Sequence, residues 1–381
     1  MKTLSKFNFK NARVLLRTDL NSDVYQGKLI ESERIKESAK TINELKKKKA
    51  KVIVIAHQSQ PGKSDFISLS QHAKLLNKYT KIKFVEDILG KKAVKEIENL
   101  KSGEAILLEN IRFEKDEFKP ERGKKNKLVK LAEICDVYVN DAFSVCHRKQ
   151  ASIVLFPSYL PSFAGKLLEK EVNALKKIKI KNCLFILGGA KPEDNLKLLG
   201  RNKVLACGLF GQLCLIASGK KLGAQNKFLK KEIKDFDKVV NELKKKLKKV
   251  KIETPLDFAV KKNNKRFEIL LQNFPNKYEI FDIGAETQKK FIKEIKKSKA
   301  IYMKGPAGYC ADTKFSKGTI TILKAIANNK KCFSLIGGGH LSDAIEISKI
   351  PKSKFSHISL SGGALLSYIA GEKLPGLEAL G

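Results

Sequence analysis

The sequence predicts an α/β fold made of two doubly wound parallel-sheet (Rossmann-like) domains joined by a hinge helix. Its 381 residues exceed what one hydrophobic core usually fills, which favours two domains. Short apolar runs alternate with amphipathic helical stretches, and this alternation is typical of a parallel sheet covered by helices. The same rhythm starts again after residue 180, so we expect a sheet in each domain.

The first domain begins with the apolar run RVLLRTDL at 13–20. Strands and helices should then follow in turn, because each short apolar run is succeeded by a segment with the 3.6-residue periodicity of a helix. In chain order the expected elements are a helix at 35–48, a strand at 51–57, a helix at 68–79, and strands at 105–113 and 136–143.

Four apolar runs mark the second domain, and each of them runs into glycine. They are NCLFILGG at 182–189, NKVLACGL at 202–209, AIYMKGP at 300–306 and CFSLIGGG at 332–339. Between the two series, prolines and a glycine lead into one amphipathic stretch. We therefore expect a first domain over 1–165, a hinge helix over 166–178 and a second domain over 179–357.

Several classes of protein are disfavoured by the composition. No run of about eighteen uncharged apolar residues is present, which argues against a membrane span. The N-terminal residues are charged and polar where a signal peptide is apolar, so we expect a cytoplasmic protein. The seven cysteines lack CxxC or Cys/His metal spacing. They predict reduced thiols, without a disulfide framework or a structural zinc site.

The formal charge of +37 invites a nucleic-acid-binding interpretation. Only eight of the 77 basic residues are arginine, however, and the lysines lie mainly along amphipathic helices, where a solvated face explains them. Because lysine occupies nearly every place where a plain positive charge suffices, each remaining arginine is informative. The arginines are Arg13, Arg17, Arg34, Arg112, Arg122, Arg148, Arg201 and Arg266.

Ligands of open parallel sheets bind beyond the carboxyl ends of the strands, so the residues after each apolar run are the candidate site. In the first domain they are polar types suited to a small anion. They are Asp19, Asn21, His57, Arg112, His147 and Arg148. In the second domain they are mostly glycines, which let a backbone approach a phosphate. They are Gly188, Gly189, Lys191, Gly208, Gly305, Pro306, Gly308, Gly337, Gly338 and Gly339.

Two of these motifs have alternative interpretations. In VNDAFSVCHRKQAS at 139–152, Cys146 and His147 are sequence neighbours, whose side chains do not face each other, so a thiol nucleophile with its base is disfavoured. Arg148 suits bidentate binding of a phosphate or carboxylate, or else a local ion pair with a carboxylate such as Asp141. LGGAKPEDN at 187–195 lacks the GxxxxGK[ST] spacing of a Walker A loop, and is either a phosphate-binding turn or a plain one.

The order of these motifs resembles the phosphoglycerate kinase family over essentially the whole chain. Members carry RVDFN where this chain has RTDLN, LLENVRF where it has LLENIRF, and NDAFGxxHRxxAS where it has NDAFSVCHRKQAS. They also carry GGAK before a helix, NGPxG near KGPAG, and GGG before the final helices. The short motifs AHQ, GPAG and GGGH are most similar to those of the archaeal branch.

The resemblance implies reversible phosphoryl transfer between 1,3-bisphosphoglycerate with Mg-ADP and 3-phosphoglycerate with Mg-ATP. It implies that Asp19, Asn21 and His57 hold the glycerate carboxylate and hydroxyl. Arg112 and Arg148 would grip the phosphate that is not transferred, while Arg34 and Lys191 would stabilise the transferred group. Phosphoryl transfer mostly asks a protein for positioning and preorganised positive charge, which agrees with these residue types.

The nucleotide, with its Mg²⁺, would lie on the second domain, and no protein metal ligand is assigned. The residues that the resemblance places around it are Gly188, Gly189, Ala190, Lys191, Asn195, Gly208, Gly305, Pro306, Gly308, Asp312, Gly337, Gly338, Gly339 and His340. The resemblance further implies that a segment over 358–381 returns to the first domain. Closure about the hinge helix would bring Arg34 and Lys191 together and exclude water. We expect a monomer.

Several positions depart from the family pattern. Gln60 stands where a phosphate-binding arginine is usual, so we expect a higher KM for phosphoglycerate unless Lys63 compensates. Asn195 replaces a second lysine near the phosphates, and Lys304 replaces an asparagine before GP. The remaining departures are Ala311 at a ribose-binding glutamate, with Asp312 as a substitute, His340 at an aspartate associated with magnesium, and Ser361 at the first glycine of GGGA.

These departures keep three alternatives open. One is a catalytically impaired phosphoglycerate kinase-like protein that still binds ligands. Another is a kinase of a different acyl phosphate or carboxylate, which the glutamine at 60 would favour. The third is a nucleic-acid-binding protein, suggested by the net charge.

Overall fold

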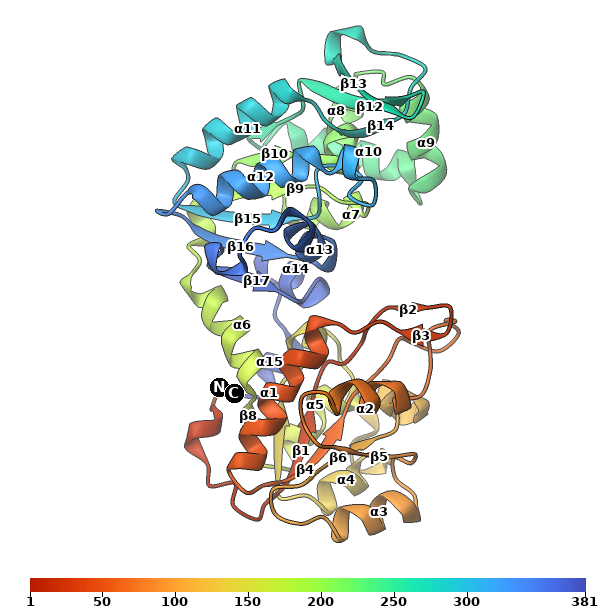
Figure 1. The fold of residues 1–381 in the computed structure, drawn as a ribbon, viewed down its shortest axis with the longest axis vertical. Coiled ribbons are helices and arrows are strands. Elements are labelled where there is room, and N and C mark those ends of the chain that lie inside the picture. The colour runs from red at the N-terminus through yellow and green to blue at the C-terminus, as the bar shows by residue number, and fades with distance from the viewer. The chain divides into compact units, whose positions relative to one another are not determined.

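The computed structural model describes residues 1–381, and these form two compact units (Figure 1). Unit 1 comprises Met1–Asn173 and Gly371–Gly381, and unit 2 comprises Ala174–Ala370. The division falls within helix α6 (Lys166–Lys177), inside the expected hinge segment. The return to unit 1 begins at residue 371, later than the expected 358, because the strand β17 (His357–Ser359) pairs with the sheet of unit 2.

The sheet of unit 1 has six parallel strands in the order β5-β6-β4-β1-β7-β8. Their bounds are β1 Arg13–Arg17, β4 Lys51–Ile55, β5 Lys83–Val85, β6 Ala105–Leu108, β7 Val137–Asn140 and β8 Ser162–Ala164. Arg17 lies opposite both Ile55 of β4 and Asn140 of β7, so these three strands end level with one another. The segments that follow them therefore start from the same edge of the sheet.

Helices flank this sheet (Figure 1). They are α1 Glu33–Lys47, α2 Ser70–Leu76, α3 Lys91–Glu98, α4 Val129–Glu133, α5 Ala151–Val154 and α15 Pro375–Glu378, and a small ribbon is formed by β2 (Val24–Tyr25) and β3 (Lys28–Leu29). Helix α1 shows why the sequence folds this way. Ile35, Ala39 and Ile42 recur at helical spacing and pack into the core with Val52 and Val54 of β4.

The sheet of unit 2 also has six parallel strands, in the order β11-β10-β9-β15-β16-β17. The further bounds are β9 Leu184–Leu187, β10 Val204–Ala206, β11 Ile252–Glu253, β15 Ala300–Lys304 and β16 Phe333–Gly337. Lys304 lies opposite Leu187 on one side and Gly337 on the other, so β9, β15 and β16 also end level. The prediction of two doubly wound α/β domains is confirmed.

The helices of unit 2 bury their apolar faces against this sheet and its neighbours. They are α7 Pro192–Asn195, α8 Gly208–Ala217, α9 Ala224–Glu232, α10 Phe236–Leu247, α11 Ala285–Lys297, α12 Lys317–Asn328, α13 Gly339–Ser348 and α14 Gly363–Ile369. Phe291 of α11 and Ile322 of α12 share one core with Ile301 and Met303 of β15. That core supports the strand ends on which the glycine-rich turns are built.

A three-stranded antiparallel sheet in unit 2 was not expected. It has the order β13-β12-β14, with bounds β12 Asp257–Lys262, β13 Lys265–Leu270 and β14 Ile280–Ile283. Its hairpin turns at Asn263 and Asn264, which both have positive φ as a two-residue type I′ turn requires. The Asn-Asn pair, between the runs DFAVKK and KRFEIL, was the available sequence signal for this hairpin.

Candidate functional site

The polar residues singled out in unit 1 lie beyond the carboxyl ends of β1, β4, β6 and β7. Strand β1 is the point at which the strand order reverses, since β4 lies on one side and β7 on the other. Crevices at such switch points are where open α/β sheets bind ligands. The fold thus brings the expected anion-binding side chains to the edge that is suited to hold a ligand.

Asp19 and Arg34 form the first contact of this cluster. Nε of Arg34 lies 3.1 Å from Oδ2 of Asp19, and Nη1 of Arg34 donates to the backbone carbonyl of Asn21 at 2.6 Å. Ser144, from the segment after β7, donates its hydroxyl to the same Oδ2 of Asp19. The Asp19 carboxylate therefore fixes the arginine, whose side chain keeps 27% of its surface exposed to solvent.

Asn21 and Arg112 are connected through the loop that follows β4. The side-chain oxygen of Asn21 accepts a hydrogen bond from the N–H of Ser59 at 2.6 Å, and Nη1 of Arg112 donates to the carbonyl of Ser59. Nη2 of Arg112 donates to Oε1 of Gln150 at 3.0 Å. These hydrogen bonds hold Arg112 in place, and only 4% of its surface is exposed. Its Nε is buried without a hydrogen-bond partner.

Arg17 is a site residue that sequence reasoning missed. It is fully buried at the end of β1, and its Nη2 lies 3.1 Å from Nδ1 of His57. Its Nε donates to Ser152 Oγ at 2.9 Å, and that hydroxyl donates to the buried carboxylate of Glu117 at 2.7 Å. The available signal was the residue type, since Arg17 is an arginine in a chain that uses lysine almost everywhere.

The electrostatics of this cluster favour an anion. Burial, followed by the positive charges of Arg17, Arg112, Arg148 and Arg34, holds the pKa of His57 well below its usual range, so the ring is neutral. Burial and the neighbouring arginines also lower the pKa of Arg112 to about 9, which leaves it cationic at neutral pH. Because an arginine can only donate, Nδ1 of His57 is the acceptor and Nε2 carries the ring proton.

Arg148 is exposed in the segment after β7 and faces no carboxylate; its Nε lies 3.4 Å from Nε2 of His147. The alternative partner Asp141 is instead occupied at the start of α6, where its Oδ1 accepts from the N–H groups of Leu167 and Leu168. Cys146 is buried, which raises the pKa of its thiol to about 12. A thiol in that state is a packing residue rather than a nucleophile.

Gln60 lies exposed in the loop after β4, and its backbone carbonyl accepts from the N–H of Lys63 at 3.2 Å. Its side-chain amide is therefore open to solvent. Lys63 is exposed in the same turn. A neutral amide is thus the group this loop presents at position 60.

In unit 2, three glycine-rich turns press against one another at the switch point between β9 and β15. A Cβ at Gly188 would lie 2.4 Å from the carbonyl oxygen of Pro306, and one at Gly305 would lie 2.7 Å from Gly188. A Cβ at Gly208 would lie 2.8 Å from the nitrogen of Gly189. These glycines are required because the turns following β9, β10 and β15 approach more closely than any side chain allows.

The same contacts use up backbone donors that were expected to face a phosphate. The N–H of Gly188 donates to Lys304 at 2.8 Å, that of Gly189 to Pro306 at 2.9 Å, and that of Gly208 to Ala307 at 3.1 Å. The expectation that all the glycine turns offer N–H groups to a ligand is therefore wrong for these three. Close packing of the turns is the physical reason.

The turn at Gly337, Gly338 and Gly339 differs from the other three. Gly338 has φ of +108°, and a Cβ at Gly338 or Gly339 would meet no atom within 4 Å. Gly339 and the exposed His340 open helix α13. The N–H groups of Leu341 and Ser342 already donate to the carbonyl of Gly338, which leaves those of Gly339 and His340 for a ligand. This helix start is open to an anion.

Two lysines add positive charge at the turns. Lys191 is exposed directly before α7, while Lys304 ends β15 with 15% of its side chain exposed. Nζ of Lys304 lies 3.1 Å from Oδ1 of Asn195 and 3.5 Å from Oδ2 of Asp194. Asn195 donates its amide to the carbonyl of Gly188 at 3.1 Å.

Asp312 and Ala311 lie in the exposed segment after Gly308. The Asp312 side chain accepts from the N–H of Lys314 at 3.0 Å, and its other oxygen lies 4.0 Å from Nζ of Lys261 in β12. Its carboxylate therefore caps a 3₁₀ turn. Ser361, at the other end of the sheet, is buried and accepts from the N–H of Leu365 at 3.2 Å.

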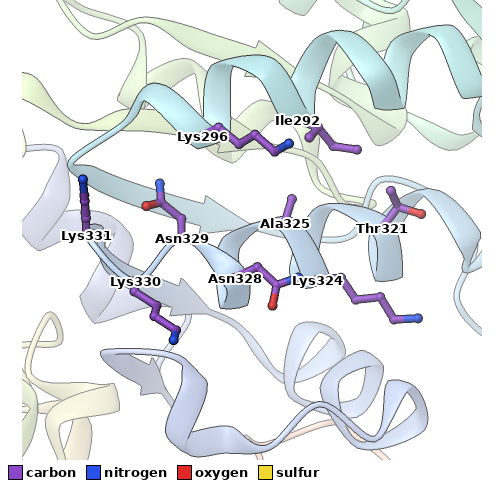
Figure 2. Close-up of a pocket in the computed structure, with 9 residues that line it drawn as sticks. All are labelled: Ile292, Lys296, Thr321, Lys324, Ala325, Asn328, Asn329, Lys330 and Lys331. Carbon is purple, nitrogen blue, oxygen red and sulfur yellow. The ribbon is translucent and has the colours of Figure 1, made fainter.

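A cavity of about 550 Å³ lies between α11 and α12 (Figure 2). Its lining includes Lys296, Lys324, Lys330 and Lys331, from segments that precede β15 and β16. It therefore lies at the amino edge of the sheet, opposite the glycine turns. Lysines near the C-termini of helices are stabilised by the helix dipole, which accounts for this charge without a ligand.

Comparisons with known proteins agree with this geometry. The family model described as phosphoglycerate kinase matches residues 4–372. The chain belongs to the phosphoglycerate kinase family. It is 40% identical over 399 residues to the phosphoglycerate kinase of Methanothermus fervidus, covering 99% of this chain and 96% of the relative. It is also 40% identical over 398 residues to that of Sulfurisphaera tokodaii, covering 99% and 95%.

Solved phosphoglycerate kinases share the architecture. The enzyme of Pyrococcus horikoshii has a TM-score of 0.91 at 37% identity, covering 100% of this chain and 98% of that one. That of Coxiella burnetii has a TM-score of 0.81 at 28% identity, covering 99% and 98%. The likeness to archaeal members noted in the sequence is thus confirmed.

Family membership gives the chain its class of activity. Phosphoglycerate kinases are phosphotransferases with a carboxyl group as acceptor, they act in glycolysis and they use a nucleotide as the second substrate. Neither the impaired-enzyme alternative nor the nucleic-acid alternative finds support in these comparisons. No helix of the structure has the length and apolar character needed to cross a membrane.

Proposed function

We propose that this chain catalyses reversible phosphoryl transfer between 1,3-bisphosphoglycerate with ADP and 3-phosphoglycerate with ATP, by means of the residues described above. The observation that carries the proposal is the convergence of Arg17, Arg34, Arg112 and Arg148 around the neutral His57 at the switch point of unit 1. Asp19 and Glu117 offset part of this positive charge. A bound anion would offset the remaining repulsion between the arginines.

The acceptor would bind to unit 1. The unpartnered Nε of Arg112 and the exposed Arg148 would hold the phosphate that is not transferred, because guanidinium groups bind phosphate oxygens in bidentate fashion. His57, with its proton on Nε2, would donate to the glycerate carboxylate. Asn21 and Asp19 would contact the hydroxyl end, while Asp19 keeps Arg34 directed toward the reacting carboxyl group.

The nucleotide would bind to unit 2 over the glycine turns. The open start of α13 and the side chain of Lys191 would attract its phosphates. The acidic residues next to Lys191 are Glu193 and Asp194, and no three His, Cys, Asp or Glu side chains are placed to hold a metal ion. That set fits Mg²⁺ carried mainly by nucleotide oxygens and water, where it would neutralise phosphate charge.

Catalysis then needs little covalent work from the protein. Arg34 and Lys191 would stabilise the charge on the equatorial oxygens of the transferred group, and in-line placement would supply most of the remaining acceleration. Because the two half-sites lie on different units, we propose that transfer requires the units to close, with α6 as the hinge. The neutral amide of Gln60 predicts weaker acceptor binding than an arginine would give.

Steady-state turnover of 3-phosphoglycerate with Mg-ATP, compared between the unchanged protein and Arg34→Ala, tests this proposal. Arg201→Ala is the matched control, because Arg201 is an exposed arginine outside both half-sites. We expect turnover to collapse in Arg34→Ala and to persist in the control. Absent turnover in the unchanged protein, or equal loss in both variants, would contradict the proposed function.

A further inference from the structure

Lys304 is in an unusual electrostatic position. It is the last residue of β15, at the switch point of unit 2, and it immediately precedes the turn at Gly305. Only 15% of its side chain is exposed, and burial lowers the pKa of the ammonium group. A cation withdrawn from water in this way requires a compensating negative group.

The protein compensates this charge only in part. The carboxylate in direct contact with the ammonium is that of Asp194, at 3.5 Å, and that side chain is itself 39% exposed. The charge of Glu193 acts on the ammonium more weakly than that of Asp194. The second contact, Oδ1 of Asn195 at 3.1 Å, is neutral. A lysine ammonium has three N–H donors, so at least one donor has no protein acceptor here.

Asn195 has a defined orientation toward this lysine. It is fully buried, and its Nδ2 donates to the carbonyl of Gly188 at 3.1 Å. The amide oxygen is thereby turned toward Nζ of Lys304. The contact places the ammonium beside the turn that follows β9. The positive charge of Lys191, in that turn, contributes to lowering the pKa of Lys304.

The glycine turns themselves cannot supply the positive charge that a nucleotide phosphate requires at this point. The N–H groups of Gly188, Gly189 and Gly208 are already bonded to backbone carbonyls. Side-chain cations must replace these donors. Lys191 and Lys304 are the lysines that the structure provides at this switch point.

We propose that Lys304 binds a phosphate of the nucleotide directly, and that Asn195 is a positioning residue which holds its ammonium toward the phosphates. This inference rests on the proposed function and assigns a further residue to its nucleotide half-site. Asp194 pairs with the ammonium when the site is empty, and a phosphate takes over that pairing when it binds. In this arrangement Lys304 supplies the positive charge, and the side-chain amide of Asn195 orients it.

The competing explanation is a purely structural ion pair between Lys304 and Asp194. Such a pair would hold the strand end and the start of α7 together, and it requires no ligand. The two explanations differ in what the phosphates of a ligand contribute to affinity. They also differ in the effect of moving the lysine. If Lys304 binds phosphate, a lysine at position 195, whose side chain lies 3.1 Å from Nζ of Lys304, should bind it as well.

The test measures ADP and adenosine binding to the full chain by titration calorimetry in the presence of EDTA, which keeps Mg²⁺ out of the comparison. We expect Lys304→Asn to weaken ADP roughly tenfold to a hundredfold, as expected for loss of one charge-assisted hydrogen bond. Adenosine, which has no phosphate, should bind unchanged. The exchange Lys304→Asn with Asn195→Lys should recover most of the ADP affinity.

Other results would overturn the inference. Unchanged ADP affinity in Lys304→Asn, or equal weakening of adenosine, would show a packing role. If that variant fails to fold, Asp194→Asn decides: removing the competing carboxylate should tighten ADP, whereas a structural pair predicts no gain. Turnover is measured separately. If the unchanged protein binds ADP without turnover, the proposed function is refuted. The assignment of Lys304 is then judged from the binding data alone.

Discussion

Asp141→Asn should gain stability relative to the unchanged protein as the pH rises from 5 to 8. The Asp141 carboxyl is fully buried at the start of α6, where Oδ1 accepts from Leu167 at 2.8 Å and Leu168 at 3.1 Å. Burial raises its pKa from 3.8 to about 7. Asparagine keeps the accepting oxygen and cannot ionise.

The magnitude follows from proton linkage. A folded-state pKa above the unfolded one means that the unfolded chain releases the proton first, so stability falls as the pH rises from about 4 to about 7. A rise of roughly three pKa units corresponds to about 4 kcal/mol in full, of which about 2–3 kcal/mol lies between pH 5 and pH 8. The new amide N–H₂ adds a cost that does not depend on pH, so the change with pH carries the prediction.

The assay is urea unfolding, followed by circular dichroism at pH 5, 6, 7 and 8, for both proteins. Asp23→Asn is the control, because Asp23 is an exposed aspartate of the same unit. The stability difference between Asp141→Asn and the unchanged protein should grow with pH, and that for Asp23→Asn should stay level. A difference for Asp141→Asn that is equal at pH 5 and pH 8 would refute the argument from burial.

Three further outcomes are expected. Arg112→Lys should raise the KM for 3-phosphoglycerate roughly tenfold to a hundredfold with little change in the KM for ATP, because a lysine cannot replace the bidentate guanidinium. A KM for 3-phosphoglycerate equal to that of the unchanged protein would count against the assignment. The ring nitrogens of His57 should show no titration between pH 6 and 8 by NMR, because burial and the surrounding arginines lower its pKa, and a midpoint in that range would show the ring to be solvated. Gly305→Ala should lower the free energy of unfolding by about 1–3 kcal/mol in denaturant titration, because φ is +73° and the new methyl would lie 2.7 Å from Gly188; wild-type stability would show that the turns can separate.

Much of the fold could be predicted from the residues alone. Apolar runs such as that at 13–20 became strands, and the restart after residue 180 marked the second sheet. Periodicity and composition carry this information directly, because a buried parallel strand needs a nearly continuous apolar run. The antiparallel sheet was missed because its edge strand β13 is largely exposed and lacks a continuous apolar run, and the apolar part of β12 is short. The turn at Asn263 and Asn264 was the clearest signal.

The site could be predicted in position and less in chemistry. Residues after the strands were expected to gather at one edge, and Asp19, Arg34 and Arg112 are linked there by contacts. The burial of Arg17 and its contact with His57 depend on side-chain packing across β1 and β4, which one sequence does not show. The return to unit 1 was placed too early because β17 pairs with β16 beyond 358.

The path of the chain has a consequence for how the molecule is made. Unit 2 is one continuous stretch, 174–370, whereas unit 1 is assembled from two separated pieces. The last piece is built tightly into unit 1: Gly376 donates its N–H to the carbonyl of Cys146 at 2.8 Å, and a Cβ there would lie 2.7 Å from Ile153. During synthesis unit 2 therefore becomes complete before unit 1 does, although unit 1 emerges first. The contacts that Gly376 makes with Cys146 and Ile153 can form only once residues 371–381 have been synthesised.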